Sequence, residues 1–115
     1  MIFNVQEKDG VKIAEFADLR RFTLAVTEDV KSELKPVLNE KGSKLVLNLE
    51  NIEFIDSSGI GCIISLVKTA KSAGTNIKLC NLQKQVVDVF ELLHLNMILD
   101  VEKDLDSAVK CFNNN

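Results

Sequence analysis

Short apolar segments alternate along this chain with longer segments whose apolar residues recur every three or four positions. The first pattern is typical of buried strands, and the second of helices that cover a sheet. Strands are predicted at residues 44–49, 77–82 and 97–101, and helices at residues 24–41, 60–73, 84–94 and 104–112. Strands that alternate with helices pair mostly in parallel, through right-handed crossovers. The sequence therefore favours a single α/β domain.

The chain opens differently, with two alternating apolar and polar runs at residues 2–6 and 11–16. Asp9-Gly10 lies between them, and this dipeptide favours a tight turn, so a β-hairpin is predicted. The expected architecture is a mixed sheet of four to five strands with helices mainly on one face. The domain is expected to span residues 1–112, and residues 113–115 are expected to fray.

Several local features carry finer expectations. Thr23 or Thr27 is a candidate N-cap for the first helix, because a hydroxyl can accept from free backbone N–H groups. Pro36 should kink that helix or split it, since proline lacks a backbone donor. Phe54 and Leu93 are expected to face the core.

Composition and charge exclude several classes of function. The 115 residues contain 14 Lys and Arg against 17 Asp and Glu, and the resulting net charge of −3 disfavours nucleic acid as a partner. No apolar run approaches the roughly 20 residues of a membrane span. Cys62, Cys80 and Cys111 lack both disulfide and zinc-ligand spacing, so they are expected to be reduced, as in the cytoplasm. His94 is the only histidine, so a multi-histidine metal site is excluded, and no cofactor is expected.

The segment Asp56-Ser57-Ser58-Gly59-Ile60-Gly61 lies between a predicted strand and a predicted helix. In α/β sheets, functional groups collect at the carboxyl ends of strands. Ser57 or Ser58 could cap the helix, and the positive end of the helix would tolerate a phosphate on a serine. The segment by itself favours an ordinary serine-capped helix, and it is also consistent with a phosphorylation site.

Known catalytic and nucleotide-binding motifs are absent from this segment. No lysine follows Gly61, as a Walker A loop would require, and the glycine spacing fits neither the dinucleotide-binding pattern nor the nucleophile elbow. An opening hairpin replaces the acidic first strand of a receiver domain, which argues against Asp56 as a phosphate acceptor. A serine hydrolase using Ser57 and His94 lacks an oxyanion-hole pattern, so an enzyme is not expected.

The sequence resembles the STAS domain family, which includes bacterial anti-sigma factor antagonists and domains of sulfate transporters. The resemblance rests on the strand 45–49, the segment 52–55 and the hexapeptide 56–61, and continues through residues 71–74, 77–80 and 87–95. It covers nearly the whole chain, and the hexapeptide lies at its expected place between strand and helix.

The resemblance implies a phosphorylation-controlled binding protein in the cytoplasm of a bacterium. Such an antagonist binds an anti-sigma factor that is itself a serine kinase, which frees a sigma factor for transcription. The kinase phosphorylates the serine that follows the motif aspartate, here Ser57, and a phosphatase resets it. The implied partner-binding residues are Asp56, Ser57, Ser58, Gly59, Ile60 and Gly61, together with Arg20.

The chain departs from the family pattern before the first helix. Where the family has Gly-x-Leu/Ile-Asp, this sequence has Ala17-Asp18-Leu19-Arg20, so a basic residue replaces an acid. The alternative functions are therefore a STAS module that acts as a scaffold, a transport accessory or a sensor of a small ligand or nucleotide.

Overall fold

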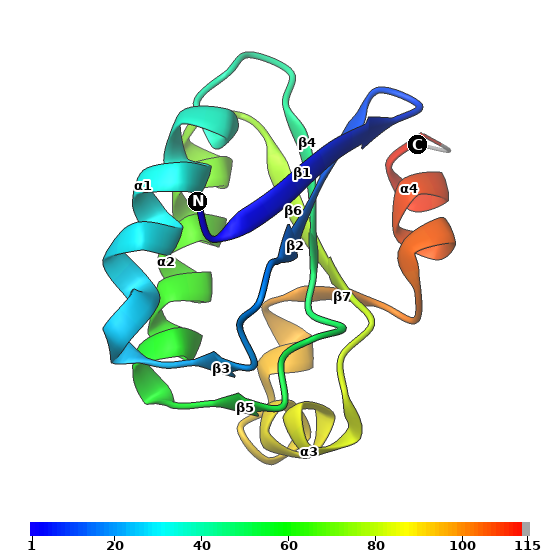
Figure 1. Ribbon diagram of the computed structural model, residues 1–115. Coiled ribbons are helices and arrows are strands. Elements are labelled where there is room, and N and C mark those ends of the chain that lie inside the picture. The colour runs from blue at the N-terminus through cyan, green and yellow to red at the C-terminus, as the bar shows by residue number, and fades with distance from the viewer. Residues whose placement is uncertain (114–115) are drawn as a thin grey trace.

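A five-stranded mixed sheet forms the centre of the molecule, with the strand order β1-β2-β4-β6-β7 (Figure 1). The computed structural model describes residues 1–113. The strands are β1 (Phe3–Lys8), β2 (Val11–Phe16), β4 (Lys44–Asn48), β6 (Asn76–Cys80) and β7 (Asp100–Glu102). Only the hairpin pair β1–β2 is antiparallel, and the other three pairs are parallel. The predicted α/β architecture is therefore confirmed.

Four helices pack around this sheet in residues 1–113. They are α1 (Thr27–Leu38), α2 (Ser57–Ser72), α3 (Lys84–Leu92) and α4 (Leu105–Asn113), and short 3-10 turns occupy Leu24–Val26 and Leu95–Met97. Figure 1 shows α1 and α2 side by side on one face, α4 on the opposite face and α3 below the sheet. The expectation of helices mainly on one face holds for α1 and α2, while α4 closes the other face.

Strand β2 shows why both faces are closed. Ala14 and Phe16 belong to the large core beneath α1 and α2, whereas Val11 and Ile13 belong to a smaller core beneath α4. All four side chains are buried. Apolar residues at both phases of a strand bury both of its faces, so the sheet is covered on two sides.

A second, two-stranded sheet lies at the end of the molecule where α1 and α2 begin. It pairs β3 (Arg21–Phe22) with β5 (Phe54–Ile55) in parallel. Each strand is only two residues long, too short for an alternating pattern to be visible in the sequence. Because each strand leads into a helix, the pair fixes both helix starts relative to each other.

Some local expectations are wrong. Helix α1 continues through Pro36 to Leu38 without a split, because the exposed proline lies near the helix end, where little of the helix remains to be disrupted. Neither Thr23 nor Thr27 caps α1, whose N-cap is Val26 with no side-chain hydrogen bond. Phe54 is 42% exposed and Leu93 is 52% exposed, because β5 lies at the surface and α3 ends before Leu93.

The C-terminal part of the chain differs in its boundaries. The predicted strand 97–101 is instead β7, which begins at Asp100, because Met97 belongs to a 3-10 turn. Asn113 is part of α4 rather than of a frayed tail, and its side chain bonds to Lys44 Nζ and to the carbonyl of Asp9. The rest of that predicted tail, residues 114–115, lies outside the described residues.

Candidate functional site

The hexapeptide 56–61 forms the corner between β5 and the start of α2. The Asp56 backbone N–H donates to the carbonyl of Phe22, at 3.2 Å, which continues the β3–β5 pairing by one residue. The Asp56 carboxylate then caps α2 by accepting from the N–H of Gly59, at 2.8 Å. The expected cap at Ser57 or Ser58 is wrong, because the carboxylate of Asp56 already occupies that role.

Asp56 also ties the corner to the start of the neighbouring helix. Its second carboxylate oxygen accepts from the backbone N–H of Leu24, at 3.3 Å. One side chain thus bridges the 3-10 turn before α1 and the first turn of α2. This bridge fixes the backbone around Ser57 from two sides.

The two serines of the corner differ in exposure. Ser57, the first residue of α2, is exposed, whereas Ser58 is half-buried. Because Asp56 provides the cap, the Ser57 hydroxyl is not needed for that purpose. Ile60 is half-buried against the main core, and Gly61 is exposed. Ser57 is therefore the hydroxyl of this corner that another protein reaches most easily.

Gly59 explains why the corner is so tight. A Cβ atom at this position would overlap the backbone oxygen of Phe22 and come within 2.8 Å of Ile55 Cγ1. Only a residue without a side chain allows α2 to pack this closely on β3 and β5. By contrast, a Cβ on Gly61 would meet nothing within 4 Å. The two glycines of the motif thus have different roles, and packing requires only the first.

Arg20 lies beside this corner but is already paired. Its guanidinium Nη1 is 3.0 Å from Glu53 Oε1, and both side chains are largely exposed. The carbonyl of Arg20 accepts from the N–H groups of Glu53 and Phe54, which places the residue next to β5. The acid-to-arginine change seen in the sequence is therefore balanced locally by Glu53. An exposed pair of this kind contributes at most about 1 kcal/mol to stability.

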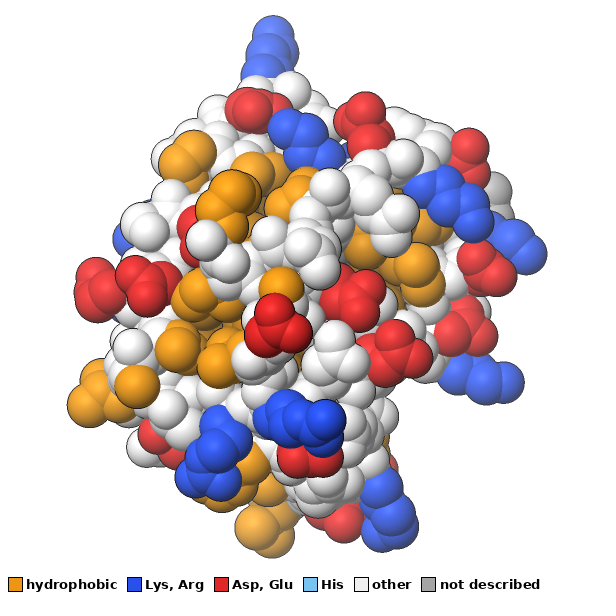
Figure 2. Space-filling model, viewed as in Figure 1, with side chains coloured by type: hydrophobic (Ala, Val, Ile, Leu, Met, Phe, Trp, Pro, Cys, Tyr) orange, Lys and Arg blue, Asp and Glu red, His pale blue; other side chains and the backbone are white. Residues whose placement is uncertain are grey.

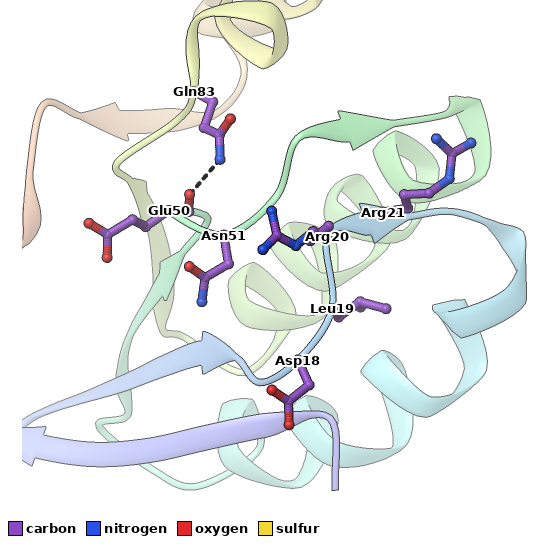
Figure 3. A pocket seen from close by; sticks show the side chains of 7 residues that line it. All are labelled: Asp18, Leu19, Arg20, Arg21, Glu50, Asn51 and Gln83. Atoms are coloured by element: carbon purple, nitrogen blue, oxygen red, sulfur yellow. Dashed lines mark hydrogen bonds between the residues drawn. The ribbon is translucent and has the colours of Figure 1, made fainter.

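A pocket of about 620 Å³ opens beside Arg20, at the carboxyl ends of β2 and β4. None of its lining residues belongs to the hexapeptide 56–61. Figure 3 shows Arg20 directed toward Asn51, and Gln83 bonded to the carbonyl of Glu50 at 2.8 Å. Asn51 donates to the carbonyl of Phe16 at 3.0 Å. The amide donors that line the pocket therefore already have partners within the protein, which weakens the case for a bound ligand.

The remaining reactive groups do not form a catalytic site. Cys62 and Cys80 are buried, as expected, and Cys111 is half-buried. Burial raises the pKa of the Cys62 thiol, and burial together with nearby Asp104 raises the pKa of Cys80 to about 12. His94 is exposed after the end of α3, with a left-handed φ of 57°. Within residues 1–113, no group of three or more His, Cys, Asp or Glu side chains is placed to hold a metal ion.

Comparison with known protein families assigns nearly the whole chain to one domain family. The profile of the STAS domain matches residues 3–108, which is nearly the whole chain. The chain belongs to the STAS domain family. The matched range includes the corner at Ser57 and the β3–β5 pair. None of the helices in the described part of this STAS domain is long and apolar enough to cross a membrane.

Individual proteins similar to this chain are named as anti-sigma factor antagonists. The STAS domain is 28% identical over 81 residues to the anti-sigma-B factor antagonist of Bacillus subtilis (strain 168), covering 70% of this chain and 73% of the relative. A solved STAS-domain anti-sigma-factor antagonist from Planctomyces limnophilus superimposes with a TM-score of 0.86 at 19% identity, covering 96% and 97% of the two chains. An anti-sigma factor antagonist from Mycobacterium paratuberculosis gives 0.83 at 16% identity, covering 96% and 92%. These relatives are named as anti-sigma factor antagonists, and the expectation that the chain is not an enzyme agrees with the family.

Proposed function

We propose that this STAS domain is an anti-sigma factor antagonist that binds an anti-sigma factor with serine kinase activity and is released when Ser57 is phosphorylated. The exposed position of Ser57 carries the proposal, because the hydroxyl begins α2 and plays no part in capping it. The likeness to the anti-sigma-B factor antagonist supports the partner class. A phosphatase would return the protein to its binding form.

The helix start explains how the fold would survive phosphorylation. A phosphoserine carries about −1.5 to −2 charges at neutral pH. Within α2, the first turn after the Asp56 cap contains no further acidic residue, so the positive end of the helix and the N–H groups other than that of Gly59 can stabilise part of the added charge. Across a protein interface the same charge would have to be desolvated, which disfavours the complex. One modification can thus weaken binding while leaving the domain folded.

The decisive experiment starts by identifying the kinase. The protein is purified with its associated proteins from its own cells, and mass spectrometry identifies the partner and locates any phosphate. Calorimetry then measures the affinity of the purified partner for wild type, Ser57→Ala and Ser57→Asp. We expect Ser57→Asp to bind about 5- to 150-fold more weakly. Ser57→Ala should still bind but accept no phosphate.

Two controls make this result specific to the corner. Ser72→Asp places the same charge on an exposed residue at the other end of α2, and should bind as wild type does. The free energy of unfolding of Ser57→Asp should stay within about 0.5 kcal/mol of wild type. Equal affinity of wild type and Ser57→Asp for the kinase would contradict the proposal.

A further inference from the structure

The surface beside Ser57 continues beyond the hexapeptide onto residues that the motif does not include. Leu24 is 70% exposed and Phe54 is 42% exposed, both large apolar side chains. Arg21 lies against Phe54, with its guanidinium carbon 4.3 Å from the ring centroid. These three residues, Arg21, Leu24 and Phe54, are called the flank below. Figure 2 shows basic and apolar side chains next to each other at the end of the molecule that carries β3 and β5.

Each residue of the flank is held by the same contacts that build the corner. The N–H of Leu24 donates to Asp56, at 3.3 Å, and the N–H of Phe54 donates to the carbonyl of Arg20, at 3.3 Å. Arg21 and Phe54 are paired across the β3–β5 sheet. A surface whose backbone is already fixed, and on which Arg21 and Phe54 are already stacked, loses less conformational entropy when it binds a partner. The flank is therefore preorganised for docking.

The two neighbouring arginines differ in charge balance. Arg20 is paired with Glu53, whereas none of the ion pairs formed by residues 1–113 includes Arg21. Both residues line the pocket, but in Figure 3 the side chain of Arg20 is directed toward Asn51 and that of Arg21 in the opposite direction. A guanidinium stacked on an aromatic ring keeps its planar N–H fork available for a carboxylate. The cation that is open to a partner is thus Arg21.

We infer that the flank is a second part of the docking surface for the anti-sigma partner, and that the partner presents a carboxylate to Arg21 with apolar side chains against Phe54 and Leu24. The inference rests on the proposed function. Charge complementarity selects this occupant, because an unpaired cation beside two exposed apolar side chains fits an acidic surface with apolar neighbours. A phosphate on Ser57 would place negative charge next to that carboxylate and repel it.

The test uses the purified anti-sigma kinase and calorimetric affinities. Arg21→Ala and Phe54→Ser should each weaken binding about tenfold or more, as central interface residues do. The loss caused by Arg21→Ala should shrink at high salt, where charge interactions are screened. A conservative variant, Arg21→Lys, should recover part of the affinity because it keeps the charge but not the fork.

Matched controls carry the same changes elsewhere on the surface. Val5→Ser alters an exposed apolar residue of β1, Lys71→Ala removes an exposed cation at the far end of α2, and both should bind as wild type does. A double-mutant cycle tests whether the flank and Ser57 act on the same part of the partner. The loss caused by Ser57→Asp should be smaller in the Arg21→Ala background, because without Arg21 the partner's carboxylate is no longer held beside residue 57.

The outcomes separate the two hypotheses. If Ser57→Asp weakens binding while Arg21→Ala and Phe54→Ser bind like wild type, the inference is wrong and the proposed function stands. If no kinase of this class binds the wild type, both are wrong. If light scattering instead shows a dimer that Phe54→Ser abolishes, a second copy occupies the flank and the inference is overturned.

Discussion

Helices α1 and α2 start side by side, yet the two starts differ in how they satisfy the positive end of a helix. Both follow a strand of the β3–β5 pair, which is parallel, so both begin at the same end of the molecule (Figure 1). Helix α1 has no side-chain cap but carries Glu28 and Asp29 in its first turn. Helix α2 is capped by Asp56 and has no acid in its first turn. Helix α2 thus meets its positive end with one carboxylate at the cap position, and helix α1 meets its own with two carboxylates inside the first turn.

The largest expected effect concerns the packing of the α2 start. Gly59→Ala should lower the free energy of unfolding by about 3 kcal/mol, because the new Cβ overlaps the backbone of Phe22 and forces the helix outward. Gly61→Ala is the matched control two residues later. With open space around it, that change should raise stability by about 0.5 to 1 kcal/mol through helix propensity. Urea unfolding measures both, and a similar loss for the two variants would contradict the packing role of Gly59.

Removing the cap of α2 should cost less. Asp56→Ala removes the acceptor of the Gly59 and Leu24 N–H groups, and should lower stability by about 1 to 2 kcal/mol. Asp56→Asn keeps an acceptor oxygen and should lose only part of this. Hydrogen exchange should also become faster at the Leu24 amide in Asp56→Ala. Unchanged exchange there would show that Asp56 does not hold the two helix starts together.

The charges of the α1 start should matter less than the cap of α2, and should depend on salt. Replacing Glu28 by Gln and Asp29 by Asn together should cost about 0.5 to 1 kcal/mol at low ionic strength. The loss should diminish in high salt, because exposed charges are screened. A loss independent of salt would mean that these side chains act through packing rather than through the helix dipole.

A third helix start should give the smallest effect, visible mainly in its pH dependence. The backbone N–H of Ser107 donates to Asp104 at 2.8 Å, and this bond holds the pKa of the Asp104 carboxyl below its ordinary value of 3.8. Its contribution to stability is thus complete above the ordinary pKa and is lost as the pH falls through the lowered one. NMR titration of the carboxyl carbon measures the pKa. Asp104→Asn should remove this part of the acid dependence, whereas a pKa at or above 3.8 would contradict it.

The main sheet was predictable from the sequence because its strands and helices are long enough to show their periodicity. The hairpin 2–16 follows from apolar patterning together with the Asp9-Gly10 turn, the strand at 44–49 follows from its apolar run, and the structure confirms both. The small β3–β5 sheet could not be found in this way. Two residues per strand carry no period, and its outer residue Phe54 is covered by Arg21 rather than by the core.

The candidate site was predictable in position but not in detail. The hexapeptide pointed to the corner before α2, yet serine and aspartate are both good caps, so their order in the sequence did not decide which one acts. The distances to Gly59 and Leu24 decide for Asp56. The sequence also drew attention to Arg20, because that residue departs from the family pattern. Its pairing with Glu53, and the lack of an ion-pair partner for Arg21 among residues 1–113, depend on strands that the sequence does not reveal.

The overlap that forbids a side chain at Gly59 has a consequence for finding related proteins from their sequences. Two residues of the hexapeptide are needed for different reasons. Gly59 is required by the packing of the fold, whereas Ser57 is the proposed site of phosphorylation. A gene that kept the glycine and lost the serine would still encode this architecture, but under the proposed function its product would offer no Ser57 hydroxyl to the anti-sigma kinase. Searching genomes with the whole signature therefore finds the corner, and the residue before its second serine tells whether the proposed phosphorylation site is present.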